Sequence, residues 1–296
     1  MVTVLLEIII DMNEFDEDIL FPVQPASSDD LSPEEAKFLI SMMTWSFSRL
    51  NSYYHCPYEW KQKYLMGQYG VGSAMAEFGS FCHVIHEKFL KGELGIFDLA
   101  MYYEDNYNEN VKLPFPPNKY TDLAEKYYNQ GLEYFENFSW DTESYELLGV
   151  EKEIKYQYQG YNFIGFIDYL IRDKADGKII IGDHKSTILK TLKNGDISKT
   201  DRPHFEEFKK QLLLYSHQII TEYGDGAIKE LQWNMFRGGT KLTIPWKREE
   251  YEEAMKWAID TIHLIEQDTL FLPDSSNFFW CHQLCSQRNN ACPYKA

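Results

Sequence analysis

The chain has 296 residues, of which 44% are hydrophobic and 16% aromatic, so it can bury a substantial core and is not a disordered protein. Its formal net charge of −17 is unfavourable for a nucleic-acid partner, because phosphate binding relies on lysine and arginine. Residues 1–36 hold ten acidic residues and no lysine or arginine, which leaves −7 for the rest of the chain. Because a binding groove needs only a local basic lining, nucleic acid is not excluded.

The N-terminal residues are predicted to contribute little to the fold. Residues 11–36 are acidic and contain proline and serine, so we expect 1–43 to form a partly disordered lead-in and 44–296 to form the folded domain. Residues 2–10 are apolar but too short to cross a bilayer, and no basic residue precedes them. We therefore expect no membrane partner and a cytoplasmic location.

Helices are predicted in the first half of the domain. Ser46 or Ser48 can cap a short helix and Pro57 can open a second one, which places Cys56 at the junction between them. Residues 76–90 show the periodicity of an amphipathic helix that carries His83, although a lone helical histidine is more often structural than a ligand. Two further helices are expected over 97–111 and 120–138, within a helical insertion at about 92–140.

Three strands follow the helices and contain a group of charged residues. We predict strands over 146–158, 161–172 and 178–185, the last two joined as a hairpin by the turn-forming residues 173–177. Folding this hairpin about Ala175 would place Asp168 opposite Gly182, next to Asp183.

These acids favour a metal site. Because strand side chains alternate, Asp183 and Lys185 share a face, and a register with Asp168 on the same face brings two carboxylates and an ammonium together. Two such carboxylates repel unless a cation lies between them, and hard oxygen ligands suit magnesium or manganese. The pattern predicts a metal-dependent centre that cuts phosphodiesters; a solvated hairpin is the alternative. Glu151 and Glu153 share a face of the first strand and could support such a site, although a solvated strand edge is an equal alternative.

The second half of the predicted core, which spans about 145–246, continues with a long helix over 203–223. Gln211 and Tyr215 lie four apart in this helix and share a face, where they could contact a DNA backbone or orient the lysine. A strand at 231–236, a return through 240–246 and a helix over 248–267 complete the prediction. Basic residues near the return are candidate phosphate contacts, with ordinary surface charge as the alternative: Arg237, Lys241, Lys247 and Arg248.

Three cysteines lie close together in the C-terminal segment 280–292. Cys281, Cys285 and Cys292 have the kind of spacing that wraps a metal or a cluster, and Cys56 is the leading candidate for a fourth ligand. Zinc would suit the same thiols, with His282 or His55 as substitute ligands. A disulfide is the weaker alternative, because nothing indicates export.

In order and spacing, these motifs resemble the RecB-like branch of the PD-(D/E)xK nuclease superfamily that carries a cysteine-bound iron–sulfur cluster. The resemblance runs from about residue 44 to the C-terminus. It rests on five segments: Gly79 to His83 as the G-x-x-x-H helix motif, Gly165 to Asp168 as G-x-x-D, Asp183 to Lys185 as D-x-K, Gln211 to Tyr215 as Q-x-x-x-Y, and Cys56 with the three C-terminal cysteines as the split cluster site. The middle residue of D-x-K is usually apolar in this family, whereas this chain has His184.

The resemblance implies a restriction-endonuclease-like α/β (α+β) fold with a mixed central sheet flanked by helices. It also implies a DNA exonuclease of recombination, repair, phage replication or CRISPR adaptation, in a bacterial or phage-infected cell, with the proteins of such a complex as possible partners. The implied residues fall into three sets: His83, Asp168, Asp183 and His184 around magnesium or manganese, with Lys185 as the catalytic lysine; Cys56, Cys281, Cys285 and Cys292 around a 4Fe-4S cluster; and Gln211, Tyr215 and Glu153 as DNA contacts or supporting residues. The alternative function is a non-catalytic scaffold that binds or mimics DNA.

Overall fold

The computed structural model describes residues 31–192, 196–276, 280–281, 285–288 and 292. Its centre is a mixed sheet in the order β1-β2-β3-β4-β5. The strands are β1 (Tyr145–Tyr158), β2 (Tyr161–Asp173), β3 (Ile179–Lys185), β4 (Ile228–Met235) and β5 (Thr240–Pro245). All neighbours are antiparallel except β3 and β4, which run parallel. This is the predicted α/β architecture with a mixed sheet.

The β2–β3 hairpin forms as predicted, but its register differs by one residue. Tyr169, and not Asp168, pairs with Gly182. The Asp173 amide donates to the Lys178 carbonyl, so the connection is centred between Ala175 and Asp176 and not on Ala175. If this antiparallel pairing is extended by one residue beyond Tyr169 and Gly182, Asp168 lies opposite Asp183. The two carboxylates then share a face of the sheet.

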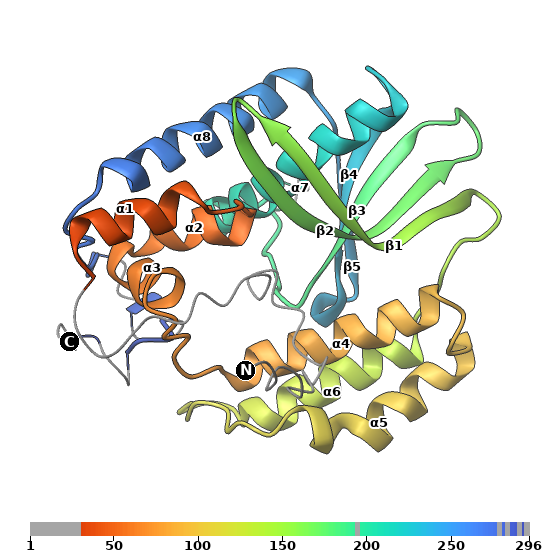
Figure 1. Ribbon diagram of the computed structural model, residues 1–296. Coiled ribbons are helices and arrows are strands. Elements are labelled where there is room, and N and C mark those ends of the chain that lie inside the picture. Colours follow the sequence, from red (N-terminus) through yellow and green to blue (C-terminus); the bar gives the residue numbers. More distant parts are fainter. Residues whose placement is uncertain (1–30, 193–195, 277–279, 282–284, 289–291, 293–296) are drawn as a thin grey trace, which may run out of the picture.

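Helix α7 (Arg202–Tyr223) makes the crossover between the parallel strands β3 and β4 and contacts β1, β2, β3 and β4. It packs against α8 (Arg248–Gln267), and α2 (Phe47–His55) contacts both of these helices. Their apolar side chains and those of the sheet form the main core, which includes Leu50, Leu212, Trp233 and Met255. Figure 1 shows α8, α1 and α2 gathered on one side of the molecule.

Helices α4 (Ala74–Leu90), α5 (Leu99–Asn110) and α6 (Leu123–Glu136) form a separate layer (Figure 1). A second apolar cluster fills this layer, with Phe78, Phe81 and Tyr103 among its buried members. The 3-10 turn η2 (Phe236–Gly238), directly after β4, adds Phe236 to the same cluster. Helices α5 and α6 lie within the range of the predicted insertion, and Trp140, which follows α6, packs on Tyr169 of the sheet.

The N-terminal boundary differs from the predicted lead-in. Helix α1 (Pro33–Ser41) is closed by a capping box between Ser32 and Glu35, and its residues Ala36 and Ile40 are buried in the main core. Residues 33–41 therefore belong to the folded domain, because their apolar side chains reach α8. The expectation for residues 1–30 lies outside the described residues.

Helix α3 (Pro57–Tyr64) follows α2 directly, with Cys56 between them as predicted. In the described part of the chain, none of the helices has the length and apolarity needed to cross a membrane.

Candidate metal centre

Side chains from α4, β1 and β2 meet at one place in the structure. His83 of α4, Glu151 of β1 and Asp168 of β2 each offer a ligand atom, and these atoms all lie within 4.8 Å of one another. His83 Nδ1 lies 3.3 Å from Asp168 Oδ2. An imidazole and two carboxylates at this spacing are a donor set that suits a divalent cation.

Burial shapes the charge of these groups. Asp168 is 9% exposed, and burial raises the pKa of its carboxyl, while Lys185 and the His184 amide act in the opposite direction. Its Oδ2 accepts that amide hydrogen bond at 2.6 Å. Burial likewise lowers the pKa of His83, which keeps its imidazole neutral, the form in which histidine binds metals.

Glu151 reaches the group through an unusual backbone conformation. Its φ is +46°, in the left-handed region that residues with a Cβ rarely adopt. Val150 pairs with Tyr169 and Lys152 with Ile167, so Glu151 lies level with Asp168 across the strand pair. Burial raises the pKa of Glu151, and the nearby carboxylate of Asp168 raises it further. A cation would relieve this repulsion.

Glu153, the supporting residue expected from the sequence, points elsewhere. Its carboxylate lies 2.7 Å from Lys155 Nζ, and its side chain is 42% exposed. The sequence pattern could not separate Glu151 from Glu153, because a regular strand places both on one face. The left-handed residue breaks this alternation and directs Glu151 alone towards Asp168.

A second group lies next to the first, on the face of the sheet that α7 covers. Lys185 Nζ lies 2.9 Å from Asp183 Oδ2 and donates to Gln211 Oε1, also at 2.9 Å. Gln211 Nε2 donates to the Tyr215 hydroxyl at 3.3 Å. The predicted residues Asp183, Lys185, Gln211 and Tyr215 are therefore in one chain of contacts, which holds the ammonium in place.

Asp183 is 2% exposed, and burial raises its pKa to about 6 although Lys185 acts to lower it. Its Oδ2 is buried and makes no contact with hydrogen-bond geometry among the described residues, although the Lys185 ammonium is near. A buried carboxylate oxygen with free lone pairs is costly unless a cation or a donor approaches it. Asp168 and His83 are also close enough to influence its charge.

His184 presents its backbone, and not its side chain, to this centre. Its amide binds Asp168, whereas its ring lies 2% exposed, stacked on His86 with the ring centres 4.0 Å apart. Asn234 Nδ2 donates to His184 Nδ1 at 2.9 Å. Because strand side chains alternate, the ring of His184 points to the opposite face from Asp183 and Lys185. If His184 contacts the metal, as the resemblance implies, the contact is therefore made by its backbone carbonyl and not by its ring.

The four predicted cluster cysteines do not form a comparable donor group. Among the described residues, the only set of three or more donors within 4.8 Å contains no cysteine. Cys56 and Cys285 are buried, and Cys281 and Cys292 are half-buried. Burial raises the pKa of Cys281, and the neighbouring thiols of Cys56 and Cys292 raise it further. His282 lies outside the described residues, and His55 instead stacks on Trp280.

The mixed sheet flanked by helices is a restriction-endonuclease-like fold. The chain belongs to the PD-(D/E)XK nuclease superfamily, whose family model matches residues 44–296.

Solved structures that are similar to the chain include two of low sequence identity. A crystal structure from Eubacterium rectale, described as a "putative exonuclease", is 14% identical, covers 91% of this chain and 94% of its own, and has a TM-score of 0.48. The structure of SSO0001 is 22% identical, covers 72% of this chain and 96% of its own, and has a TM-score of 0.27. No curated protein matches the chain.

Proposed function

We propose that the protein is a metal-dependent DNA exonuclease with its active centre at His83, Glu151, Asp168, Asp183 and Lys185. The observation that carries the proposal is the compact donor set of His83, Glu151 and Asp168 beside an ordered lysine. Action on DNA ends rests on the order of the sequence motifs, which is that of the RecB-like branch.

The donor set fits magnesium or manganese. The carboxylates of Glu151, Asp168 and Asp183 are hard ligands, and the neutral imidazole of His83 shifts the preference towards manganese. A bound cation would supply Lewis-acid chemistry, lowering the pKa of an attacking water and neutralising charge on the phosphate.

Lys185 supplies the remaining positive charge. Its ammonium is held between Asp183 and Gln211, so it enters the reaction already oriented and needs no rearrangement as negative charge builds up on the phosphate. Gln211 and Tyr215 act as positioning residues, since they fix the ammonium and not the phosphate. No covalent nucleophile is required, because water can attack the phosphorus in line.

The test is digestion of single- and double-stranded DNA, labelled at either end, with manganese or magnesium and with a chelator as control. We expect metal-dependent release of short products from an end, and loss of about 10²-fold or more in kcat for Lys185→Ala and Asp183→Ala, since each removes transition-state stabilisation. Undiminished cutting by these variants would refute the site. Cleavage of circular DNA would show endonuclease action, and binding without cleavage in either metal would favour the scaffold alternative.

Glu151 and Glu153 provide a matched pair for the donor set. Glu151→Gln keeps the shape of the side chain but removes a charged ligand, so we expect the metal concentration for half-maximal activity to rise about tenfold or more. Glu153→Gln changes the same type of residue two positions away, where the carboxylate faces Lys155, and should leave the metal dependence unaltered. If both variants needed the same metal concentration for half-maximal activity, Glu151 would not be a metal ligand.

We also propose that Cys56, Cys281, Cys285 and Cys292 hold a structural metal centre, either a 4Fe-4S cluster or zinc. The support is the spacing of the cysteines and the contacts of their neighbours: Trp280, before Cys281, stacks on His55, before Cys56, and Ser286, after Cys285, donates to Glu59 of α3. The thiols themselves do not meet as a donor group in the described residues, so the metal would have to draw them together. Anaerobic purification followed by visible absorption and iron and zinc analysis tests it. A brown, iron-containing protein whose colour is lost in Cys281→Ser indicates the cluster. A colourless protein with one bound zinc indicates the alternative. A protein that contains neither iron nor zinc would refute the proposed centre.

A further inference from the structure

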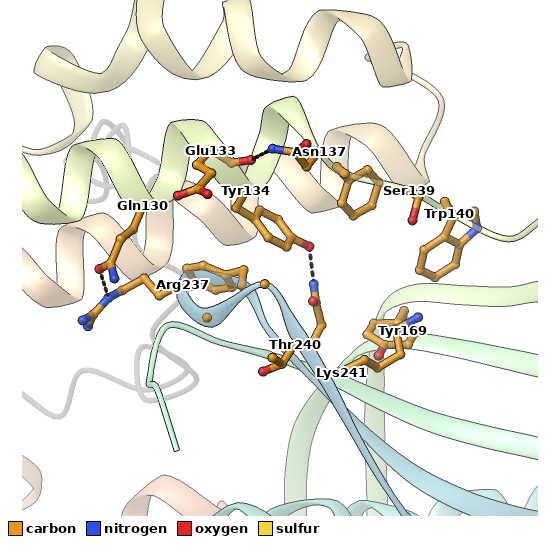
Figure 2. Close-up of a pocket in the computed structure, with 15 residues that line it drawn as sticks. Gln130, Glu133, Tyr134, Asn137, Ser139, Trp140, Tyr169, Arg237, Thr240 and Lys241 are labelled. Atoms are coloured by element: carbon orange, nitrogen blue, oxygen red, sulfur yellow. Dashed lines mark hydrogen bonds between the residues drawn. The ribbon is translucent and has the colours of Figure 1, made fainter. Parts of the chain in front are cut away.

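The cavity in Figure 2 lies away from the reacting groups. It has a volume of about 490 Å³ and lies between α6 and the turn that joins β4 to β5. Asn234 lines it and pairs with His184 across the parallel strands, so both side chains point to the face of the sheet opposite Asp183 and Lys185. A substrate that contacts the lysine is therefore bound on the other face, where α7 lies.

A row of side chains on α7 continues outward from Lys185. Phe208 and His204 lie one and two turns before Gln211, so they share its face of the helix. The Lys185 ammonium lies 5.1 Å from the centre of the Phe208 ring, and the His204 ring meets the same ring edge to face at 4.9 Å. Phe208 is buried, whereas His204 is half-buried. His204 is therefore the member of this row beyond the lysine that a substrate can contact.

Helix α2 extends the row with further rings. Burial lowers the pKa of His204, and the charges of His55 and Lys185 lower it further, so His204 lies near both. Trp280 stacks on His55, with the ring centres 3.9 Å and the ring planes 7° apart. Tyr54 meets His55 edge to face at 6.1 Å and is 63% exposed. Accessible rings of this kind are platforms on which nucleobases stack.

A cation without a carboxylate partner adjoins these rings. Lys210 Nζ lies 5.6 Å from the ring centre of Tyr54 and 4.7 Å from that of Trp257 on α8. Lys210 is half-buried, and in the described part of the chain it forms no ion pair. The neighbouring acids Glu206 and Glu207 pair with other side chains. A half-buried ammonium in this position favours an anion from outside, such as a phosphate of DNA.

We infer that the face formed by Tyr54, His204 and Lys210, here called the α2–α7 face, binds the single strand of DNA that leads to the metal centre. The inference rests on the proposed function and deepens it. His204 donates a hydrogen bond to a phosphate close to Lys185, whereas Tyr54 stacks on a base further along the strand and Lys210 contacts a phosphate beside it. Bases inside a duplex are stacked on each other, so only an unpaired strand offers one to Tyr54. The face therefore favours single-stranded DNA.

Binding of a labelled oligothymidylate tests the face without any need for cleavage. With a chelator present, we expect fluorescence anisotropy to show that a strand of about twelve nucleotides binds more tightly than its duplex with oligoadenylate. Tyr54→Leu and Lys210→Gln should each raise the Kd of the single strand about tenfold, because a stacking contact or a charge contact is lost. Tyr54→Trp, which keeps an aromatic ring in case the leucine variant unfolds, should recover most of the affinity.

Strand length separates the inner residue of the face from the outer two. In the cleavage assay, Tyr54→Leu and Lys210→Gln should raise KM more for a strand of about twelve nucleotides than for one of about three, which does not reach them. His204→Ala should raise KM for both strands, and His204→Gln, which can still donate a hydrogen bond, should recover most of the loss. The effects should fall on KM with little change in kcat, since binding is altered and not the reacting group.

Two variants in the helical layer serve as matched controls. Tyr120→Leu removes an aromatic side chain that is 88% exposed just before α6, and Lys126→Gln removes an exposed lysine on α6. Neither should change the Kd or the KM of single-stranded DNA.

The outcomes separate this inference from the nuclease proposal. Metal-dependent cleavage with no single-strand binding, or with Kd and KM unchanged in Tyr54→Leu and Lys210→Gln, would overturn the α2–α7 face and leave the nuclease intact. Single-strand binding that depends on these residues in a protein that cuts no DNA would support the face and refute the nuclease. Equal binding of strand and duplex would overturn the assignment to single-stranded DNA.

Discussion

Tyr215 shows how one residue far in sequence shapes the active centre. A Cβ added at Gly165 would lie 2.4 Å from Tyr215 Cε1 and 2.8 Å from Cζ, closer than atoms can approach. The absence of a side chain at residue 165 therefore lets the tyrosine ring lie against the strand. From there its hydroxyl accepts from Gln211, which in turn contacts Lys185. The glycine of G-x-x-D is needed for packing and not for chemistry.

We therefore expect Gly165→Ala to lower both stability and activity. The new methyl group must displace the Tyr215 ring or the strand, at a cost of about 1–3 kcal/mol in unfolding free energy. Displacement of the ring would also free Gln211 and lower kcat. Chemical denaturation and cleavage kinetics measure the two effects. Gly72→Ala, where the nearest atom is a Leu113 methyl at 3.5 Å, is the control and should change neither; wild-type values for Gly165→Ala would contradict the packing argument.

His217 predicts a pH dependence of stability. It lies on α7, where Nδ1 is 2.6 Å from the Tyr251 hydroxyl, and burial lowers its pKa below the ordinary value of 6.5. A lowered histidine pKa means that the unfolded chain binds a proton before the folded one. Its contribution to stability is therefore complete above pH 6.5 and is lost as the pH falls towards the folded-state pKa.

Urea unfolding at pH 7, 6 and 5 measures this contribution. We expect His217→Gln to lose less unfolding free energy than the wild type between pH 7 and 5, because the variant has no proton to bind at this position. His263→Gln, which changes an exposed histidine on α8, should lose as much as the wild type. Parallel pH profiles for all three proteins would show that His217 does not titrate in this way.

At the scale of elements, helix α3 holds the C-terminal segment through one buried acid. Glu59 is 5% exposed and accepts three hydrogen bonds, from Trp280 Nε1 at 2.7 Å and from the amide and hydroxyl of Ser286 at 2.8 Å each. Phe271 adds a ring stacked on Trp60 of the same helix, with the ring centres 5.6 Å apart. These contacts hold the segment to α3 whether or not the cysteines bind a metal.

Glu59→Gln should weaken this attachment. A carboxamide has a single acceptor oxygen, so either Trp280 or Ser286 would face a donor instead of an acceptor, at a cost of roughly 1–3 kcal/mol. We expect a lower unfolding free energy and faster cleavage of the C-terminal segment by a protease. Glu109→Gln, an exposed acid on α5, is the control. Unchanged proteolysis of the Glu59 variant would show that other contacts hold the segment.

At the scale of the whole molecule, the centre joins separate parts of the chain. His83 comes from the helical layer, whereas Glu151 and Asp168 come from the sheet. In the absence of a cation their carboxylates repel, so the metal-free protein is less stable than its packing alone allows. A ligand that binds only the folded state stabilises it by an amount set by its concentration relative to Kd.

We expect manganese to raise the unfolding free energy by about 2–3 kcal/mol at 100 times its Kd. Thermal unfolding with and without the metal measures this. Asp168→Asn removes a ligand and relieves the repulsion, so this variant should be at least as stable as the metal-free wild type and gain little from manganese. If manganese stabilised Asp168→Asn as much as the wild type, the ion would not be bound by Asp168.

The sequence by itself determined the order of elements and most of the centre. Periodicity and capping residues are local signals, so the helices and strands after residue 44 were predicted to within a few residues, including α7 and the β2–β3 hairpin, whereas α1 was not predicted. Asp168, Asp183, Lys185, Gln211 and Tyr215 were predicted as one group from their motifs, and the structure brings them close together.

Tertiary structure decided what depends on exact register and backbone conformation. A shift of one residue in the hairpin pairing sets Asp168 level with Asp183, and the left-handed residue in β1 directs Glu151, and not Glu153, towards Asp168. The direction of the His184 ring follows from strand alternation, whereas its partners come from α4 and β4. The cavity beside it joins residues of α6, β2 and the β4–β5 turn. These are contacts between distant segments, and periodicity within one segment carries no information about them.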